Sequence, residues 1–373
     1  MAAPETIFGG EQVERNGFAI DGARRRGRGA SSNASGRFET SARSGFDDGW
    51  ETLAELPPFK TEVQFEPART IISTNDSPDI SFDQSINPYR GCEHGCIYCY
   101  ARPTHCYLGH SAGLDFETKL YAKPNAAELL ERELANPRYR PRTIVLGTNT
   151  DPYQPIEREH GITRQILEVL EKANHPIGIV TKSASVVRDS DILERMARKG
   201  LAKVALSVTT LDRRLARAME PRASTPHLRL AALAELSAKG IPTAVMMAPI
   251  IPSLTDHEIE GLLEAAAKAG VREAGYVLLR LPLEIKTLFR EWLDEHEPGR
   301  SHRVINRLKE MHDGADYRSQ FRLRQTGSGP YAAQIAQRFR MARRRLGLDG
   351  ERQMPRTDLF RPPVLPGGQL ELL

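Results

Sequence analysis

From about residue 80 to residue 300, short apolar runs rich in β-branched residues alternate with longer segments that have the spacing of amphipathic helices. The strand-like runs are residues 79–91, 143–148, 176–183, 202–210, 242–250 and 273–279. A helical segment follows each run, and after the first run a cysteine-rich loop comes between. Because these runs are too apolar to be half exposed, they indicate parallel strands covered by helices. The pattern therefore predicts six β/α units.

Six units fit either an open, doubly wound sheet or an incomplete barrel. No glycine-rich phosphate-binding fingerprint follows the first run, which weakens the dinucleotide-binding form of the open sheet. Polar residues gather at the carboxyl ends of three successive runs: Thr148, Asn149, Thr150, Asp151, Thr181, Lys182, Ser183, Ser207, Thr209 and Thr210. In a barrel of parallel strands these ends form the face where chemistry takes place. We therefore predict an α/β fold of the partial (β/α)6 barrel type.

The two ends of the chain differ in composition from this central part. Residues 22–43 are rich in Gly, Ser and Arg and contain few large apolar side chains, so we expect residues 1–55 to be a mostly disordered leader. Residues 56–300 would form the barrel, and residues 301–373 a helical extension with a Pro/Gly-rich tail. In the basic helix of this extension, Phe339 and Leu346 are expected to pack inward, with the arginines in solvent.

Composition and charge narrow the class of protein. The chain has 373 residues, 40% of them hydrophobic and 27% charged, as is typical of a globular protein. No run is long enough to span a membrane and the N-terminus lacks a secretory pattern, so we expect a cytoplasmic location. A net charge of +4 does not by itself imply nucleic acid as a partner. The arginine-rich ends could bind nucleic acid through its phosphates, or could simply be solvated.

All four cysteines lie within fifteen positions: Cys92, Cys96, Cys99 and Cys106. In a reducing compartment such a group favours a metal or redox site over a disulfide. The first three have the spacing C-x3-C-x2-C, and three thiolates can bind three irons of an iron–sulfur cluster while a fourth iron stays open.

Two other sites would use the same cysteines. A structural zinc site could be completed by His94, His105 or Cys106, although zinc sites are usually built from paired C-x2-C-type groups. A cluster held by four cysteines, Cys106 included, would serve electron transfer and leave no iron open.

The segment CEHGCIYC, residues 92–99, resembles the cluster motif of the radical S-adenosylmethionine (radical SAM) superfamily, in which an aromatic residue precedes the third cysteine. The longer stretches INPYRGCEHGCIYCYARPTH, GTNTDPYQPIE, TKSASVVRD, SVTTLD and MMAPIIPSLTD resemble its spore photoproduct lyase-like branch, over about residues 80–290. The core fold of the superfamily is a six-unit partial barrel. The resemblance implies an enzyme whose 4Fe–4S cluster, reduced by a flavodoxin- or ferredoxin-like donor, cleaves S-adenosylmethionine to a 5′-deoxyadenosyl radical. That radical abstracts a hydrogen atom from the substrate.

The resemblance also implies which residues contact S-adenosylmethionine. Tyr98 should lie against the adenine through its backbone. Thr150 and Asp151 follow the second strand, where the family contacts the methionine amino group or the ribose. Lys182 matches a basic residue near the methionine carboxylate.

Two further positions complete this set. Ser207, at the end of the fourth strand, matches a contact to the ribose or carboxylate, and Arg229 is a second candidate for the carboxylate. These positions also have ordinary structural interpretations. Serine or threonine at a strand end often caps a helix or forms a turn, and Arg229 could pair with an acid such as Glu235.

The chain departs from the spore photoproduct lyases at one position. Those enzymes use a further cysteine just past the second strand to return a hydrogen atom to the product, whereas this stretch reads GTNTDPYQ and no cysteine follows Cys106. Cys106 or Tyr153 are the alternative donors. The resemblance therefore does not extend to the thymine-dimer repair reaction itself.

Overall fold

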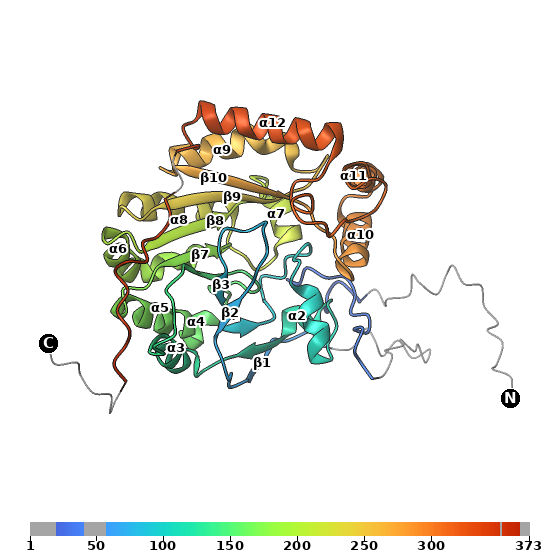
Figure 1. Cartoon of the computed structure of the whole chain (residues 1–373). Helices are drawn as coiled ribbons and strands as arrows, with labels where there is room; N and C mark the ends of the chain where they lie inside the picture. Colours follow the sequence, from blue (N-terminus) through green and yellow to red (C-terminus); the bar gives the residue numbers. More distant parts are fainter. Residues whose placement is uncertain (1–19, 41–56, 351–352, 366–373) are drawn as a thin grey trace.

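The computed structural model describes residues 20–40, 57–350 and 353–365, which form two sheets with helices packed around the larger one (Figure 1). The strands are β1 Glu62–Phe65, β2 Ile72–Thr74, β3 Gln84–Ile86, β4 Tyr89–Arg90, β5 Lys119–Ala122, β6 Ile144–Leu146, β7 Ile177–Thr181, β8 Ala202–Ser207, β9 Thr243–Ile250 and β10 Glu273–Leu278.

Helices follow most of these strands and cover the sheet. The α-helices are α2 Asp115–Thr118, α3 Ala126–Leu134, α4 Glu157–His160, α5 Ile162–Lys172, α6 Ser190–Arg198, α7 Arg213–Met219, α8 Pro226–Ala238, α9 Ile259–Lys268, α10 Ile285–His296, α11 Pro298–Met311 and α12 Gly329–Arg345. Short 3-10 helices occur at η2 Arg102–Leu108, η3 Ala184–Asp189 and η4 Asp256–Glu258. None of the helices in the described ranges has both the length and the apolar character needed to cross a bilayer.

The larger sheet has the strand order β10-β9-β8-β7-β6-β3-β2. All its pairs are parallel except β2 with β3, so the six parallel strands are the six predicted from the apolar runs. Because these six strands are parallel, their carboxyl ends share one face. This arrangement confirms the predicted partial barrel.

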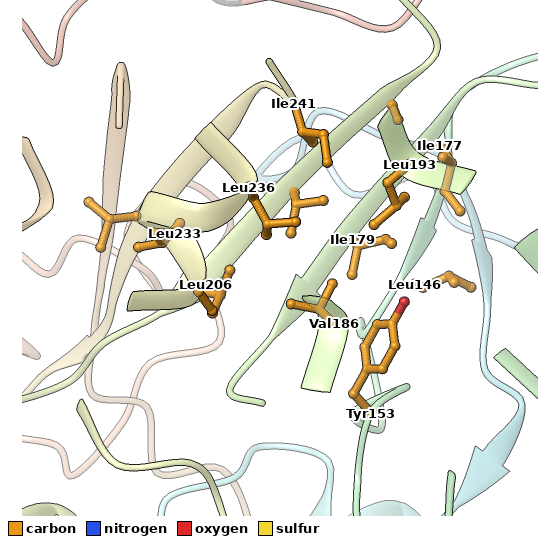
Figure 2. Close-up of a cluster of buried hydrophobic side chains, with 14 of the residues drawn as sticks. Leu146, Tyr153, Ile177, Ile179, Val186, Leu193, Leu206, Leu233, Leu236 and Ile241 are labelled. Atoms are coloured by element: carbon orange, nitrogen blue, oxygen red, sulfur yellow. The ribbon is translucent and has the colours of Figure 1, made fainter. Parts of the chain in front are cut away.

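The core lies between the sheet and its outer helices. Figure 2 shows side chains of β7 and β8, such as Ile179 and Leu206, in one cluster with Leu193 of α6 and Leu236 of α8. Each of these four side chains is almost completely removed from solvent. Burial of this apolar area stabilises the strands and so fixes the face at their carboxyl ends.

A second sheet, of order β1-β5-β4, was not predicted. Its strands are short, and most of β1 is exposed, so they lack the apolar runs that mark the larger sheet. Strand β4 pairs antiparallel with β5, with Tyr89 opposite Ala122. The cysteine-rich loop leaves β4 and the chain returns in β5, so this pairing joins the two ends of the loop.

Residues 20–40, which we call the strap, are packed against the cysteine-rich loop and lie beside α2 (Figure 1). Ala30 and Ser32 are buried, and the backbone N–H groups of Gly29 and Ala30 donate hydrogen bonds to Glu117. The prediction of a disordered leader was wrong here, because small residues and a buried carboxylate anchor the chain without large apolar side chains. The rest of the expected leader, residues 1–19 and 41–55, lies outside the described residues.

The basic helix α12 packs against α9 and β10. Phe339 is buried and its ring centroid lies 4.7 Å from that of Tyr276, as the inward-facing prediction requires. Arg338 pairs with Glu260 at 2.6 Å, so at least one arginine of this helix binds within the molecule. The division of the chain at residue 300 stays a prediction.

Candidate functional site

The cysteine-rich loop begins with two tight turns that bring three cysteines together. The N–H of Gly95 donates to the carbonyl of Cys92 at 3.3 Å, and the N–H of Cys99 donates to the carbonyl of Cys96 at 3.1 Å. Gly95 has a φ of +65°, and a side chain there would meet the Glu117 carboxylate. A glycine is therefore required at this turn.

The three thiols form one electrostatic group. Cys92 and Cys96 are buried, and Cys99 is half-buried. Burial raises the pKa of Cys92, and the neighbouring charges of Asp151, Cys96 and Cys99 raise it further. Burial also raises the pKa of Cys96, while Lys182 acts in the opposite direction. Binding of a cation to these thiols would therefore have to displace their protons.

Cys106 belongs to a different environment. It is buried against the strap, where a Cβ at Gly36 would lie 3.4 Å from its sulfur. Burial raises the pKa of its thiol, and the charged groups that act on it are Arg37 and Glu284.

The histidines of the proposed zinc site have other partners. His94 Nδ1 lies 3.3 Å from Asp151 Oδ2, and His105 Nε2 lies 2.9 Å from the carbonyl of Lys119. Across the described ranges, no three His, Cys, Asp or Glu side chains converge closely enough to hold a single metal ion. A cluster requires less convergence, because each thiolate binds a different iron. Both histidines that could complete a zinc site are engaged by other groups.

Asp151 joins the loop after β6 to the end of β7. It accepts hydrogen bonds from Thr181 Oγ1 at 2.7 Å and from the N–H of Lys182 at 2.8 Å. Burial opposes ionisation of Asp151, but His94 and these hydrogen bonds lower its pKa to about 2. Thr150 is also buried and donates to the carbonyl of Tyr89 at 3.0 Å. The side chains of both predicted contacts are thus engaged within the protein.

Lys182 is a cation without an anionic partner at the end of β7. Its Nζ lies 5.5 Å from the ring centroid of Tyr98, and its charge acts on the Cys96 thiol. No carboxylate among the residues that the structure describes is within ion-pair distance of it. This lysine is therefore available to an anionic group beside the cysteines.

A buried network connects Tyr98 to the remaining predicted residues. The Tyr98 hydroxyl donates to Glu220, which also accepts from Thr209 and pairs with Arg229. Arg229 Nη1 donates to the carbonyl of Ser207 at 2.9 Å. Arg229 thus pairs with an acid, as its structural interpretation suggested, but with Glu220 rather than the example Glu235. Glu220 was missed because it follows α7 and lies far along the chain from Tyr98.

A second buried network, also missed, fixes the backbone of the cysteine-rich loop. Arg102 is completely buried and donates from Nε to the carbonyl of Cys96 at 2.9 Å and from Nη2 to that of Gly95 at 3.0 Å. Its Nη2 also pairs with Glu117 at 2.6 Å. The Glu117 carboxylate accepts from the strap as well, so one acidic side chain joins strap, arginine and loop.

Comparisons with known proteins identify a family. A family model described as the radical SAM superfamily matches residues 86–266. An uncharacterized protein of Mycobacterium tuberculosis (strain ATCC 25618 / H37Rv) is 35% identical over 240 residues, covering 64% of this chain and 69% of its own. The radical SAM Nalpha-GlyT isomerase of Pseudomonas phage M6 is 28% identical over 210 residues, 52% of this chain and 41% of its own.

A solved structure of spore photoproduct lyase complexed with dinucleoside spore photoproduct has a similar fold. The TM-score is 0.53, with 14% identity, and the match covers 76% of this chain and 79% of that one. At this identity the likeness concerns the fold alone.

Proposed function

Because the chain belongs to the radical SAM superfamily, we propose that Cys92, Cys96 and Cys99 hold its 4Fe–4S cluster and leave one iron open to S-adenosylmethionine. The chain is a radical SAM enzyme, and the cofactors of that superfamily are a 4Fe–4S cluster and S-adenosylmethionine. The observation that supports the ligand set is the grouping of three mutually interacting thiols, with Cys106 facing the strap instead.

Held by Cys92, Cys96 and Cys99, the cluster would supply the single electron with which enzymes of this superfamily generate a 5′-deoxyadenosyl radical from S-adenosylmethionine. The protein's own part is to hold the loop rigid, exclude water and orient the reacting groups. Arg102 serves the first purpose, since it binds the carbonyl of Cys96. Glu117 joins Arg102 to the strap, and Asp151 joins the loop after β6 to the N–H of Lys182.

We further propose how the predicted contacts divide. Lys182 binds the methionine carboxylate, because its ammonium group lies over the Tyr98 ring and pairs with no carboxylate among the described residues. Ser207 and the backbone of Tyr98 contact the nucleoside part. The side chains of Thr150 and Asp151 hold the loop after β6, so their contacts with S-adenosylmethionine come through the backbone. Arg229 acts through Ser207, whose carbonyl it holds.

Anaerobic reconstitution with iron and sulfide tests the ligand set. Reduced protein with S-adenosylmethionine should form 5′-deoxyadenosine, and Cys99→Ala should lose both bound iron and product. Cys106→Ala is the matched control and should keep both. If Cys106→Ala loses its iron and the native chain forms no 5′-deoxyadenosine, the cluster is held by four cysteines and our proposal is wrong.

Radical SAM enzymes require an external reductant. For this chain we propose a flavodoxin- or ferredoxin-like donor and a cytoplasmic location, where clustered cysteines stay reduced. We also propose a nucleic-acid substrate, bound in part through the arginine-rich ends. The support for this substrate class is the concentration of arginines in the two ends of the chain.

A salt titration tests the nucleic-acid proposal. Binding of a mixed-sequence duplex DNA fragment should weaken by about a factor of a thousand between 50 and 200 mM salt if about six phosphates are neutralised. An affinity that does not change with salt, or no binding at low salt, would exclude a nucleic-acid substrate and favour a small molecule or peptide.

A further inference from the structure

Arg280 lies directly beside the cysteine-rich loop. It follows β10 at the carboxyl end of the strand, on the face where the site is formed. Its guanidinium carbon is 5.2 Å from the ring centroid of Tyr100, and Tyr100 follows Cys99 in the chain. Arg280 therefore contacts the residue next to Cys99, a proposed ligand of the cluster.

The Arg280 side chain is oriented from two sides. Its guanidinium carbon also lies 5.8 Å from the ring centroid of Tyr317, and Nη2 donates to the Tyr317 hydroxyl at 3.2 Å. Two aromatic rings therefore restrict the orientation of the guanidinium plane. Because the Arg280 side chain is already ordered, binding of a ligand costs less conformational entropy.

Arg280 forms no ion pair with any described residue, although its charge helps to lower the pKa of the nearby Asp79. Among the described residues no carboxylate lies within ion-pair distance of Arg280, and its Nε is buried without a hydrogen-bond partner. The neighbouring Asp79 is engaged by Arg324 and by the backbone N–H of Arg322. Arg102 and Arg229, by contrast, each pair with a carboxylate.

An unpaired, partly desolvated guanidinium is unfavourable unless an anion completes it. A guanidinium presents parallel N–H donors that match the two oxygens of a carboxylate or phosphate. Among the described residues Asp79 supplies only a longer-range attraction, because Arg324 and the N–H of Arg322 already bind its oxygens, so a ligand is the remaining source.

We infer that Arg280, held between Tyr100 and Tyr317, binds an oxyanion of the substrate, a phosphate or a carboxylate, beside the cysteine-rich loop. This inference rests on the proposed function, because it places the substrate next to the proposed cluster. The methionine carboxylate has a separate candidate in Lys182, which lies over Tyr98 rather than Tyr100.

The test measures the thermal unfolding midpoint of the full-length protein in sodium phosphate, acetate or chloride of equal ionic strength and pH. An oxyanion that binds the folded state raises the midpoint, by about 2 °C when it is well above its Kd. We expect this rise over chloride in the native chain and its loss in Arg280→Gln. The relative effects of phosphate and acetate identify the substrate group.

Arg290→Gln is the matched control, because it removes the same charge from an arginine that is paired with Asp316. It should keep the anion response. An equal response in Arg280→Gln, or no rise over chloride with either anion, would overturn the inference.

A second arm separates substrate from cofactor. The phosphate or acetate response is repeated on reconstituted protein saturated with S-adenosylmethionine. A response that persists supports a substrate subsite, whereas one that S-adenosylmethionine abolishes would assign Arg280 to the cofactor and overturn the inference. Neither measurement depends on formation of 5′-deoxyadenosine. Failure of the inference about Arg280 is therefore distinguishable from failure of the proposed function.

Discussion

At the scale of single residues, the Glu117 carboxylate connects three parts of the site through its hydrogen bonds and its ion pair. Its carboxylate is completely buried and accepts from Gly29 N–H at 2.8 Å, Ala30 N–H at 2.9 Å and Arg102 at 2.6 Å. Glu117→Gln would leave the Arg102 charge buried and unpaired. We expect the free energy of unfolding to fall by about 3 kcal/mol, measured by denaturant titration, and the reconstituted variant to bind less iron.

The control for this variant is Glu235→Gln, which removes an exposed carboxylate paired with Lys239 one helical turn away. Such surface pairs contribute about 0.5 kcal/mol or less. If both variants lose equally little stability, Glu117 does not hold the loop as we describe.

The residues of the site differ in how far the sequence reveals them. Cys92, Cys96 and Cys99 are identifiable because their spacing is local. Glu117 and Glu220 are not, since the contacts that bring them to the site come from Gly29, 88 residues away, and from Tyr98, 122 residues away, even though each also pairs with a nearer arginine. Contacts of that separation depend on the fold, and a single sequence carries no signal for them.

At the scale of elements, the strap depends on one close approach of backbone to backbone. A Cβ at Gly29 would lie 1.8 Å from the carbonyl oxygen of Gly95. Gly29→Ala should therefore move the strap away from the loop, and amide exchange at residues 29 and 30 should become at least about tenfold faster. Hydrogen–deuterium exchange with mass spectrometry measures this change.

Gly22→Ala provides the comparison, because nothing lies within 4 Å of a Cβ at that strap position. Its exchange at residues 29 and 30 should match the native chain. Unchanged exchange in Gly29→Ala would show that the strap can accept a side chain at the loop.

The elements themselves were predictable where burial leaves an apolar run. Strands β6 to β10 have such runs, and Ile144, Val145 and Leu146 of β6 are all buried. Strand β1 could not be predicted, because its side chains are mostly exposed and its pairing with β5 uses backbone groups. The strap, with its small and polar residues, has no periodic pattern at all.

At the scale of the whole molecule, His175 ties together three distant parts of the chain. It is completely buried before β7, where Nδ1 donates to the carbonyl of Pro176 at 3.0 Å. Its Nε2 lies 2.7 Å from the Tyr139 hydroxyl, and its ring is edge-on to Phe360 near the C-terminus, at 5.4 Å between centroids. This packing has no room for a protonated, hydrated imidazolium.

Burial lowers the pKa of His175 to about 4, from an ordinary value near 6.5. Between these values the unfolded chain binds a proton that the folded chain does not, so stability falls as the pH is lowered through this window. The loss for this residue alone reaches about 3 kcal/mol at pH 4. His105, whose pKa burial also lowers to about 4, adds to the same trend.

Denaturant titrations between pH 7 and pH 4 measure this loss of unfolding free energy. The free energy should decline less steeply with falling pH in His175→Gln than in the native chain. Replacing the exposed His257 with Gln should leave the slope unchanged. Equal slopes in all three proteins would mean that His175 is protonated without cost, and that the contact of β7 with the C-terminal segment opens readily in acid.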